Sequence, residues 1–118
     1  MKRIYIAGAL NSDACGYIKN LHKMIIYAEK VRKEEFSVFI PGIDFLAGVV
    51  IGTYNYNDYF DNSQPWMECA DALFLVPGWI KSKGTKKEIL KAKELNIPIF
   101  CRIKDLVKYY NNGKAKEK

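Results

Sequence analysis

The sequence has few cysteines, one histidine and no long apolar run, and each shortage argues against a class of protein. Its three cysteines, Cys15, Cys69 and Cys101, lie far apart and form no C-x-x-C pair, so neither a disulfide framework nor a zinc site is supported. We expect free, buried thiols, and no metal ion or cofactor. No apolar stretch reaches the roughly 18 residues of a membrane span, and residues 1–3 lead into a strand-like run rather than a signal peptide. These features predict a cytoplasmic protein that does not enter a membrane.

The composition is that of one folded domain. Apolar residues make up 49% and charged residues 27% of the chain, a balance typical of globular rather than disordered proteins. We assign a single domain to residues 1–110 and predict that the lysine-rich residues 111–118 form a basic, disordered tail. The formal net charge of +6 favours an anionic partner. It fits a phosphate-bearing metabolite and a nucleic acid equally well.

Apolar runs without polar alternation predict strands that are covered on both faces. They cover residues 3–7, 37–40, 72–76 and 97–100. Helical patterns follow three of them, over residues 17–33, 85–95 and 103–110. This alternation predicts an α/β fold, a Rossmann-like three-layer sandwich whose small, mainly parallel sheet has about four or five strands. Such sheets bind ligands beyond the carboxyl ends of their strands, which here means the loops after Ala7, Ile40 and Val76.

The first predicted helix has one regular apolar stripe. Ile18, Leu21, Ile25 and Ala28 recur at spacings of three and four, which predicts that this face packs on the core. His22 lies among the lysines of the other face, where we expect a surface residue.

Residues 44–64 are the least regular part of the sequence. The segment combines an apolar piece at residues 45–51 with an aromatic cluster, and a helix, a lid and an oligomer contact each fit it. The aromatic cluster of Tyr54, Tyr56, Tyr59 and Phe60 fits core packing and partial exposure equally well, because four large aromatic side chains are seldom all fully buried.

The segment at residues 82–88 opens a helix just beyond the third strand, which is a ligand position. Free N–H groups at a helix start would suit an anion held by Ser82, Gly84 and Thr85. The same segment also fits a capping box, in which Glu88 turns back to the N–H of Thr85. The local pattern favours the cap and leaves both interpretations open.

Four motifs in this order resemble the nucleoside 2-deoxyribosyltransferase superfamily. They are Tyr5-Ile6-Ala7-Gly8, Ala70-Asp71-Ala72-Leu73, Ser82-x-Gly84-x-x-x-Glu88 and Ile97-Pro98-Ile99-Phe100. The similarity covers most of residues 2–100 and is greatest to the short branch of 2'-deoxynucleoside 5'-phosphate N-hydrolases and to small phage and bacterial relatives of unassigned activity. It implies a homo-oligomer that binds a nucleoside or nucleotide and cleaves or exchanges its N-glycosidic bond.

The resemblance also implies roles for single residues. Glu88 would be the nucleophile that forms a covalent sugar intermediate, and Tyr5 would lie beside it, although a buried strand tyrosine fits that position as well. The positions expected to bind substrate are Gly8, Ala9, Ser82, Gly84 and Thr85. Asp71 fits the resemblance and is expected to anchor the start of a strand.

Two positions depart from the pattern. The register of the family's aspartate falls on Ser63, so Asp61, the nearest carboxylate, is the candidate for protonating the departing base; it could equally cap a helix beginning near Gln64. Ala9-Leu10-Asn11-Ser12 stands where the phosphate hydrolases have a serine and basic residues, which leaves recognition of a 5'-phosphate open.

Three functions follow, in order of preference. The first is the glycosidic enzyme acting through Glu88, as a hydrolase or a transferase. The second is a nucleotide sensor without catalysis, which the changed aspartate position motivates. The third is a nucleic-acid binder that uses the basic tail and the tyrosines as stacking platforms.

Overall fold

A computed structural model describes residues 1–10, 14–41 and 44–117. Strands and helices alternate along the chain, as the sequence predicts. In chain order they are β1 (Arg3–Ala7), α1 (Ala14–Arg32), β2 (Ser37–Phe39), α2 (Asp44–Ile51), α3 (Tyr56–Glu68), β3 (Ala72–Leu75), the 3-10 helix η2 (Trp79–Lys81), α4 (Lys83–Glu94), β4 (Ile99–Phe100) and α5 (Ile103–Glu117).

The four strands form one parallel sheet in the order β2-β1-β3-β4. The chain leaves β1 toward β2 on one side and then returns to β3 on the other, so the direction of strand addition reverses between β1 and β3. Asp71 joins the starts of these two strands. Its carboxylate accepts a hydrogen bond from the Arg3 N–H at 2.8 Å, and its own N–H donates to the Arg3 carbonyl, also at 2.8 Å. The expected anchoring role of Asp71 is confirmed.

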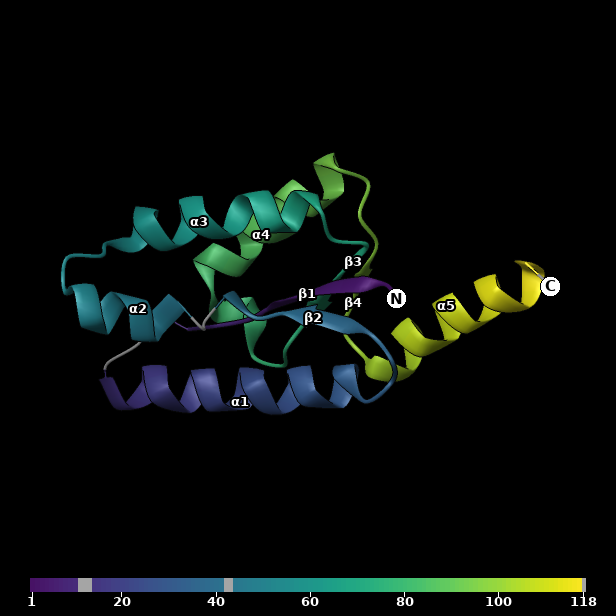
Figure 1. The fold of residues 1–118 in the computed structure, drawn as a ribbon, viewed down its shortest axis with the longest axis horizontal. Helices are drawn as coiled ribbons and strands as arrows, with labels where there is room; N and C mark the ends of the chain where they lie inside the picture. Colours follow the sequence, from purple (N-terminus) through teal and green to yellow (C-terminus); the bar gives the residue numbers. More distant parts are fainter. Residues whose placement is uncertain (11–13, 42–43, 118) are drawn as a thin grey trace.

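Helices cover both faces of the sheet, which makes a three-layer sandwich (Figure 1). Along β1, Ile4 and Ile6 point to the face covered by α1 and α5. Tyr5 and Ala7 point to the opposite face, covered by α3 and α4. This double burial explains why the strands read as continuous apolar runs in the sequence. The predicted Rossmann-like sandwich is confirmed.

The predicted buried stripe of α1 is wrong in part. Ile18 is 58% exposed and Ile25 is 44% exposed, whereas Met24, Ala28 and Val31 are fully buried. These three buried residues are also spaced by four and three, so α1 carries two overlapping apolar stripes. The spacing of apolar residues alone does not determine which of the two stripes of α1 packs against the sheet.

Residues 44–68 form two helices, α2 and α3. A capping box fixes the start of α3: the Asn55 side chain accepts a hydrogen bond from the Asp58 N–H at 3.1 Å, and the Asp58 carboxylate accepts from the Asn55 N–H at 2.7 Å. Asp61 therefore lies inside α3. The alternative that Asp61 caps a helix beginning near Gln64 is wrong, because the stronger capping signal stands upstream.

The exposed surface corrects one further expectation. Cys15, Cys69 and Cys101 are free, as predicted, but all three are exposed rather than buried. His22 is exposed on α1, as predicted. Among the helices of the described ranges, none is long and apolar enough to cross a membrane.

The last helix, α5, continues beyond its predicted end at Tyr110 and reaches Glu117. Residues 111–117 are therefore helical where the sequence predicts a disordered tail. Figure 1 shows the far end of α5 projecting away from the sheet. Leu106, which is fully buried, fixes the near end of α5 to the core.

Replacing Leu106 with alanine should lower the free energy of unfolding by about 2–5 kcal/mol, because the change leaves a cavity between α5 and the sheet. Leu90→Ala is the matched control, since Leu90 is 62% exposed on α4, and it should change the value by about 0.5 kcal/mol at most. Urea titration followed by circular dichroism measures both. Equal losses in the two variants would contradict this placement of α5.

Candidate active site

A cavity of about 220 Å³ lies beyond the carboxyl ends of β1 and β3, at the reversal point of the sheet. Its walls come from the loop after β1, from α1, from Pro41 after β2, from α3 and the residues just before it, and from the beginning of α4. Glu88 is the one carboxylate among the described residues that line it. The cavity therefore combines a single acidic group with walls that are otherwise uncharged.

The start of α4 leaves Glu88 available to this cavity. Ser82 caps the helix: its hydroxyl oxygen accepts the Thr85 N–H at 3.1 Å and the Thr85 hydroxyl at 3.0 Å. The predicted capping box, with Glu88 turned back to Thr85, is therefore wrong, because Ser82 already occupies that N–H. Glu88 lies one turn beyond Gly84 on the same face of α4, and both line the cavity.

Burial raises the pKa of Glu88 from its ordinary value of 4.5 to about 7. A hydrogen bond from the Tyr5 side chain acts in the opposite direction and lowers the pKa, because it favours the charged carboxylate. Tyr5 is fully buried on β1. Glu88 is thus held between its protonated and ionised forms near neutral pH.

Gly8 allows the two strand ends to meet beneath the cavity. A Cβ added at Gly8 would lie 3.0 Å from the Cβ of Val76, closer than side-chain atoms normally approach. A glycine therefore lets the chain after β1 pass close to the end of β3 without displacing Val76. Gly8 itself lines the cavity, as the sequence predicts.

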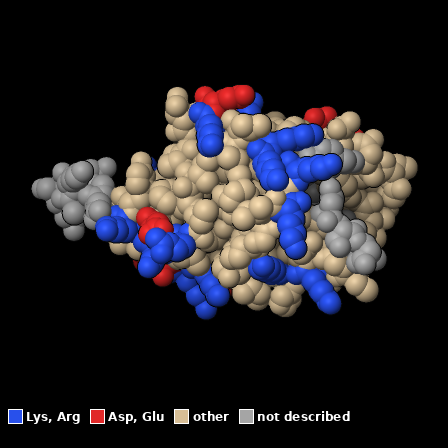
Figure 2. All heavy atoms as spheres, turned by 180° about the vertical axis from the view of Figure 1, so that it is seen from behind, with Lys and Arg blue, Asp and Glu red and all other residues tan. Residues whose placement is uncertain are grey.

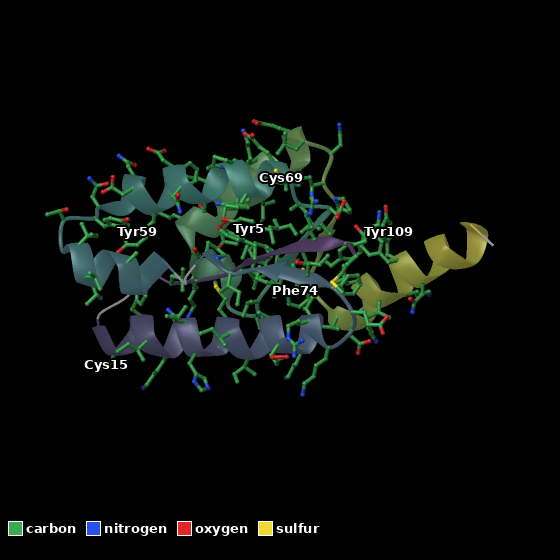
Figure 3. All side chains as sticks on the ribbon, viewed as in Figure 1. Tyr5, Cys15, Tyr59, Cys69, Phe74 and Tyr109 are labelled. Atoms are coloured by element: carbon green, nitrogen blue, oxygen red, sulfur yellow. The ribbon has the colours of Figure 1, made fainter. Side chains whose placement is uncertain are left out.

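Aromatic side chains form the wall of the cavity opposite the sheet. Tyr54 and Tyr59 meet edge to face, with ring centroids 5.3 Å apart, and Phe60 lies beside them in α3. A Cβ at Gly48 would overlap the Tyr59 hydroxyl, so α2 reaches this close only as glycine. Figure 3 shows Tyr59 between α2 and α3, and Tyr5 between the sheet and the layer of α3 and α4. Such rings can stack on a planar ligand.

The structure brings together most of the predicted site residues. Gly8, Ser82, Gly84, Thr85 and Glu88 line the one cavity. Ala9 lines a second cavity beside it. Asn11 and Ser12, which bear on recognition of a 5'-phosphate, lie outside the described residues.

Asp61 is the exception. It is exposed on α3 and does not line the cavity, whereas Ser63 lines it and is only 5% exposed. Residues two apart on a helix point to nearly opposite sides, because each residue turns the helix by about 100°. Only one of these two can therefore face the site. The Ser63 hydroxyl donates a hydrogen bond to the Phe60 carbonyl at 3.1 Å.

Sequence reasoning missed two parts of the site. The sequence shows the tyrosine cluster, but it does not show that the cluster forms a wall of the cavity, because no pattern in residues 44–64 fixes where that segment packs. Lys23, Lys81, Lys83 and Lys87 line the second cavity and were not singled out. The described part of the chain contains no group of three or more acidic, histidine or cysteine side chains that could hold a metal ion.

Comparison with models of protein families identifies the family of this chain. A profile of the family described as "Domain of unknown function (DUF4406)" matches residues 2–101. The chain belongs to the DUF4406 family. The match includes Tyr5, Glu88 and all the described residues that line the two cavities, and it ends before α5. No curated protein and no solved structure matches the chain.

Burial of Glu88 should make stability depend on pH. Its folded pKa of about 7 exceeds the ordinary 4.5, so its stabilising contribution is full below pH 4.5 and is lost as pH rises through 7. Glu88→Gln should therefore raise the free energy of unfolding at pH 8, by about 3 kcal/mol at most, and change it little at pH 5. Urea titrations across this range measure the difference, with Glu94→Gln on the exposed side of α4 as control. A Glu88→Gln variant less stable than the native protein at pH 8 would argue against this burial.

Removing the Tyr5 hydroxyl should raise the pKa of Glu88 further. In Tyr5→Phe the hydrogen bond that favours the carboxylate is lost while burial remains, so the midpoint should move above about 7. Carbon-13 NMR titration of the glutamate carboxyls measures it, with Tyr27→Phe on α1 as the control. An unchanged midpoint would show that Tyr5 does not act on Glu88.

Proposed function

We propose that this protein cleaves the N-glycosidic bond of a 2'-deoxynucleoside or its 5'-monophosphate through a covalent glycosyl intermediate on Glu88. One observation carries the proposal: a single carboxylate of raised pKa faces a cavity with aromatic walls, at the position where sheets of this type bind ligands. The resemblance of the four motifs to those of the nucleoside 2-deoxyribosyltransferase superfamily supports the choice of reaction.

In the first step the ionised Glu88 attacks the anomeric carbon of the sugar. A C–O bond to Glu88 forms, the C–N bond breaks, and its electron pair leaves with the nucleobase, which takes up a proton. In the second step water attacks the same carbon, the C–O bond to Glu88 breaks with its electron pair returning to the carboxylate, and the attacking water loses a proton to solvent, which leaves the free sugar. If a second nucleobase takes the place of water, the same intermediate leads to base exchange.

The neighbouring residues have separate tasks in this reaction. Tyr5 positions Glu88 and favours its ionised form, which is the nucleophile. Tyr54, Tyr59 and Phe60 offer ring faces against which a planar nucleobase can stack. Ser82 and Gly84 hold the start of α4 against the sugar side of the cavity.

Protonation of the departing base falls to water in this proposal. Asp61, the carboxylate that the sequence offers for this task, is exposed outside the cavity, and the Ser63 hydroxyl is engaged with the Phe60 carbonyl. A positioned general acid contributes about a hundred- to ten-thousandfold to rate. Turnover without one should be slow, and this is the feature that brings a non-catalytic nucleotide sensor into consideration.

The resemblance also implies a homo-oligomer, and the sequence features described above predict a cytoplasmic protein; we include both in the proposal. Apolar side chains that such an assembly would cover are exposed on α1 and α2. They are Ile18, Ile25, Val49, Val50 and Ile51.

Incubation with deoxynucleosides and their monophosphates should release free base, and Glu88→Ala should lower the rate by roughly a thousandfold or more. Chromatography of the base measures it, and Glu94→Ala is the matched control on the exposed side of α4. Because the nucleophile must be ionised, kcat/KM should rise as pH passes about 7. Undiminished release by Glu88→Ala would rule out this nucleophile, and saturable binding without product would favour the sensor.

A further inference from the structure

A second cavity, of about 680 Å³, adjoins the Glu88 cavity at the start of α4. The two cavities share Leu10, Met24, Ser82 and Gly84 in their walls. All charged side chains among the described residues of the second cavity are lysines. They are Lys23 from α1, Lys81 from η2, and Lys83 and Lys87 from α4. We call this space the four-lysine cavity.

The arrangement of α4 separates the two kinds of charge. Lys83 and Lys87 are four residues apart and share one face of the helix, while Gly84 and Glu88 share the adjacent face. One helix therefore presents ammonium groups to the larger cavity and a carboxylate to the smaller one. A ligand that crosses the shared wall would meet both.

Three of the four cations in the four-lysine cavity have no acidic partner among the described residues. Lys23, Lys81 and Lys83 form no ion pair with any carboxylate of the described residues, whereas Lys91 on the outer side of α4 pairs with Glu68 at 3.5 Å. Lys87 lies 6.0 Å from the centroid of the Phe60 ring. The Lys23 ammonium lies near the turn at Gly78: a Cβ added at Gly78 would be 3.5 Å from Lys23 Nζ.

Figure 2 shows lysine and arginine side chains gathered on the face opposite to that of Figure 1, with few acidic groups among them. Like charges brought together from three separate elements repel one another, and the field in a recess is stronger than on a flat surface. Such a recess attracts an anion.

We propose that the four-lysine cavity binds a chain of phosphates. A phosphomonoester carries about two negative charges near neutral pH, fewer than the three ammonium groups of Lys23, Lys81 and Lys83, whereas a di- or triphosphate carries about three or four. The cavity is also the larger of the two, at about 680 Å³ against about 220 Å³. If the proposed function holds, on which this second step rests, the substrate is a deoxynucleoside di- or triphosphate whose sugar reaches Glu88.

The lysines converge on a recess rather than forming a stripe along the surface, which favours a free nucleotide over a nucleic-acid strand. A strand would need cations that follow its backbone beyond the cavity. The recess also shares its wall with the Glu88 cavity, so the anion and the sugar can belong to one small molecule.

Calorimetry with sodium tripolyphosphate and with orthophosphate, at one ionic strength, tests the anion site. Tripolyphosphate should bind at least about tenfold more tightly, and Lys81→Gln/Lys83→Gln should weaken it by about a hundredfold, since each hydrogen bond to a charged group is worth about a factor of ten. Lys19→Gln/Lys93→Gln removes the same charge outside the cavity and should stay within about threefold of the native protein. Equal weakening by both double variants, or equal binding of the two anions, would overturn the proposal.

Base release from deoxynucleoside mono- and triphosphates separates this inference from the proposed function. A higher kcat/KM for the triphosphates, lost in Lys81→Gln/Lys83→Gln, supports both. Release from monophosphates, with neither preference for triphosphates nor tripolyphosphate binding, overturns the inference and leaves the function standing. Lysine-dependent tripolyphosphate binding without base release supports the anion site and rejects the enzyme. Tighter binding of a single-stranded oligonucleotide than of tripolyphosphate would also overturn it.

Discussion

The close approach of β1 and β3 at their carboxyl ends is the constraint on which the site depends. Gly8 lets the chain pass beside Val76, and at this point the connections after β1 and β3 leave the paired strands in opposite directions along the sheet. The loop after β1 and the beginning of α4 can then share one cavity. Since Ser82 rather than Glu88 caps α4, the carboxylate faces that cavity instead of its own helix. A side chain at position 8 would force Val76 or the loop after β1 to shift by a few tenths of an ångström.

The local environment of Glu88 matters more to its charge than the lysines nearby. Its pKa is governed by burial and by Tyr5, although Lys87 is the adjacent residue in the chain. Water screens the exposed ammonium groups, which point to the other cavity, while burial removes the hydration of the Glu88 carboxyl. The helix α4 can therefore carry both a carboxyl group whose pKa is near 7 and several lysines, without the lysines returning that pKa to its ordinary value. Folding gives up some stability to keep that carboxyl buried, a trade that is common at functional sites.

The sequence predicts what is local and regular in this protein. The apolar runs mark the strands because parallel strands are buried on both faces, and Ser82, Gly84 and Glu88 fall together because helical spacing places them. The sequence does not predict how the elements pack against one another. Nothing in the sequence says which of two stripes on α1 meets the sheet, or that Ser63 rather than Asp61 faces the cavity. The convergence of lysines from α1, η2 and α4 is likewise a property of packing, since no single segment contains them all.

Both outer strands of the sheet are very short: β2 has three residues and β4 has two. An outer strand with so few free N–H and C=O groups is a poor template for a strand of another molecule. Short outer strands therefore disfavour aggregation by edge-to-edge strand pairing, although the inner strands are apolar throughout. Any assembly of several copies would join through helical surfaces, and the sheet would end within each copy.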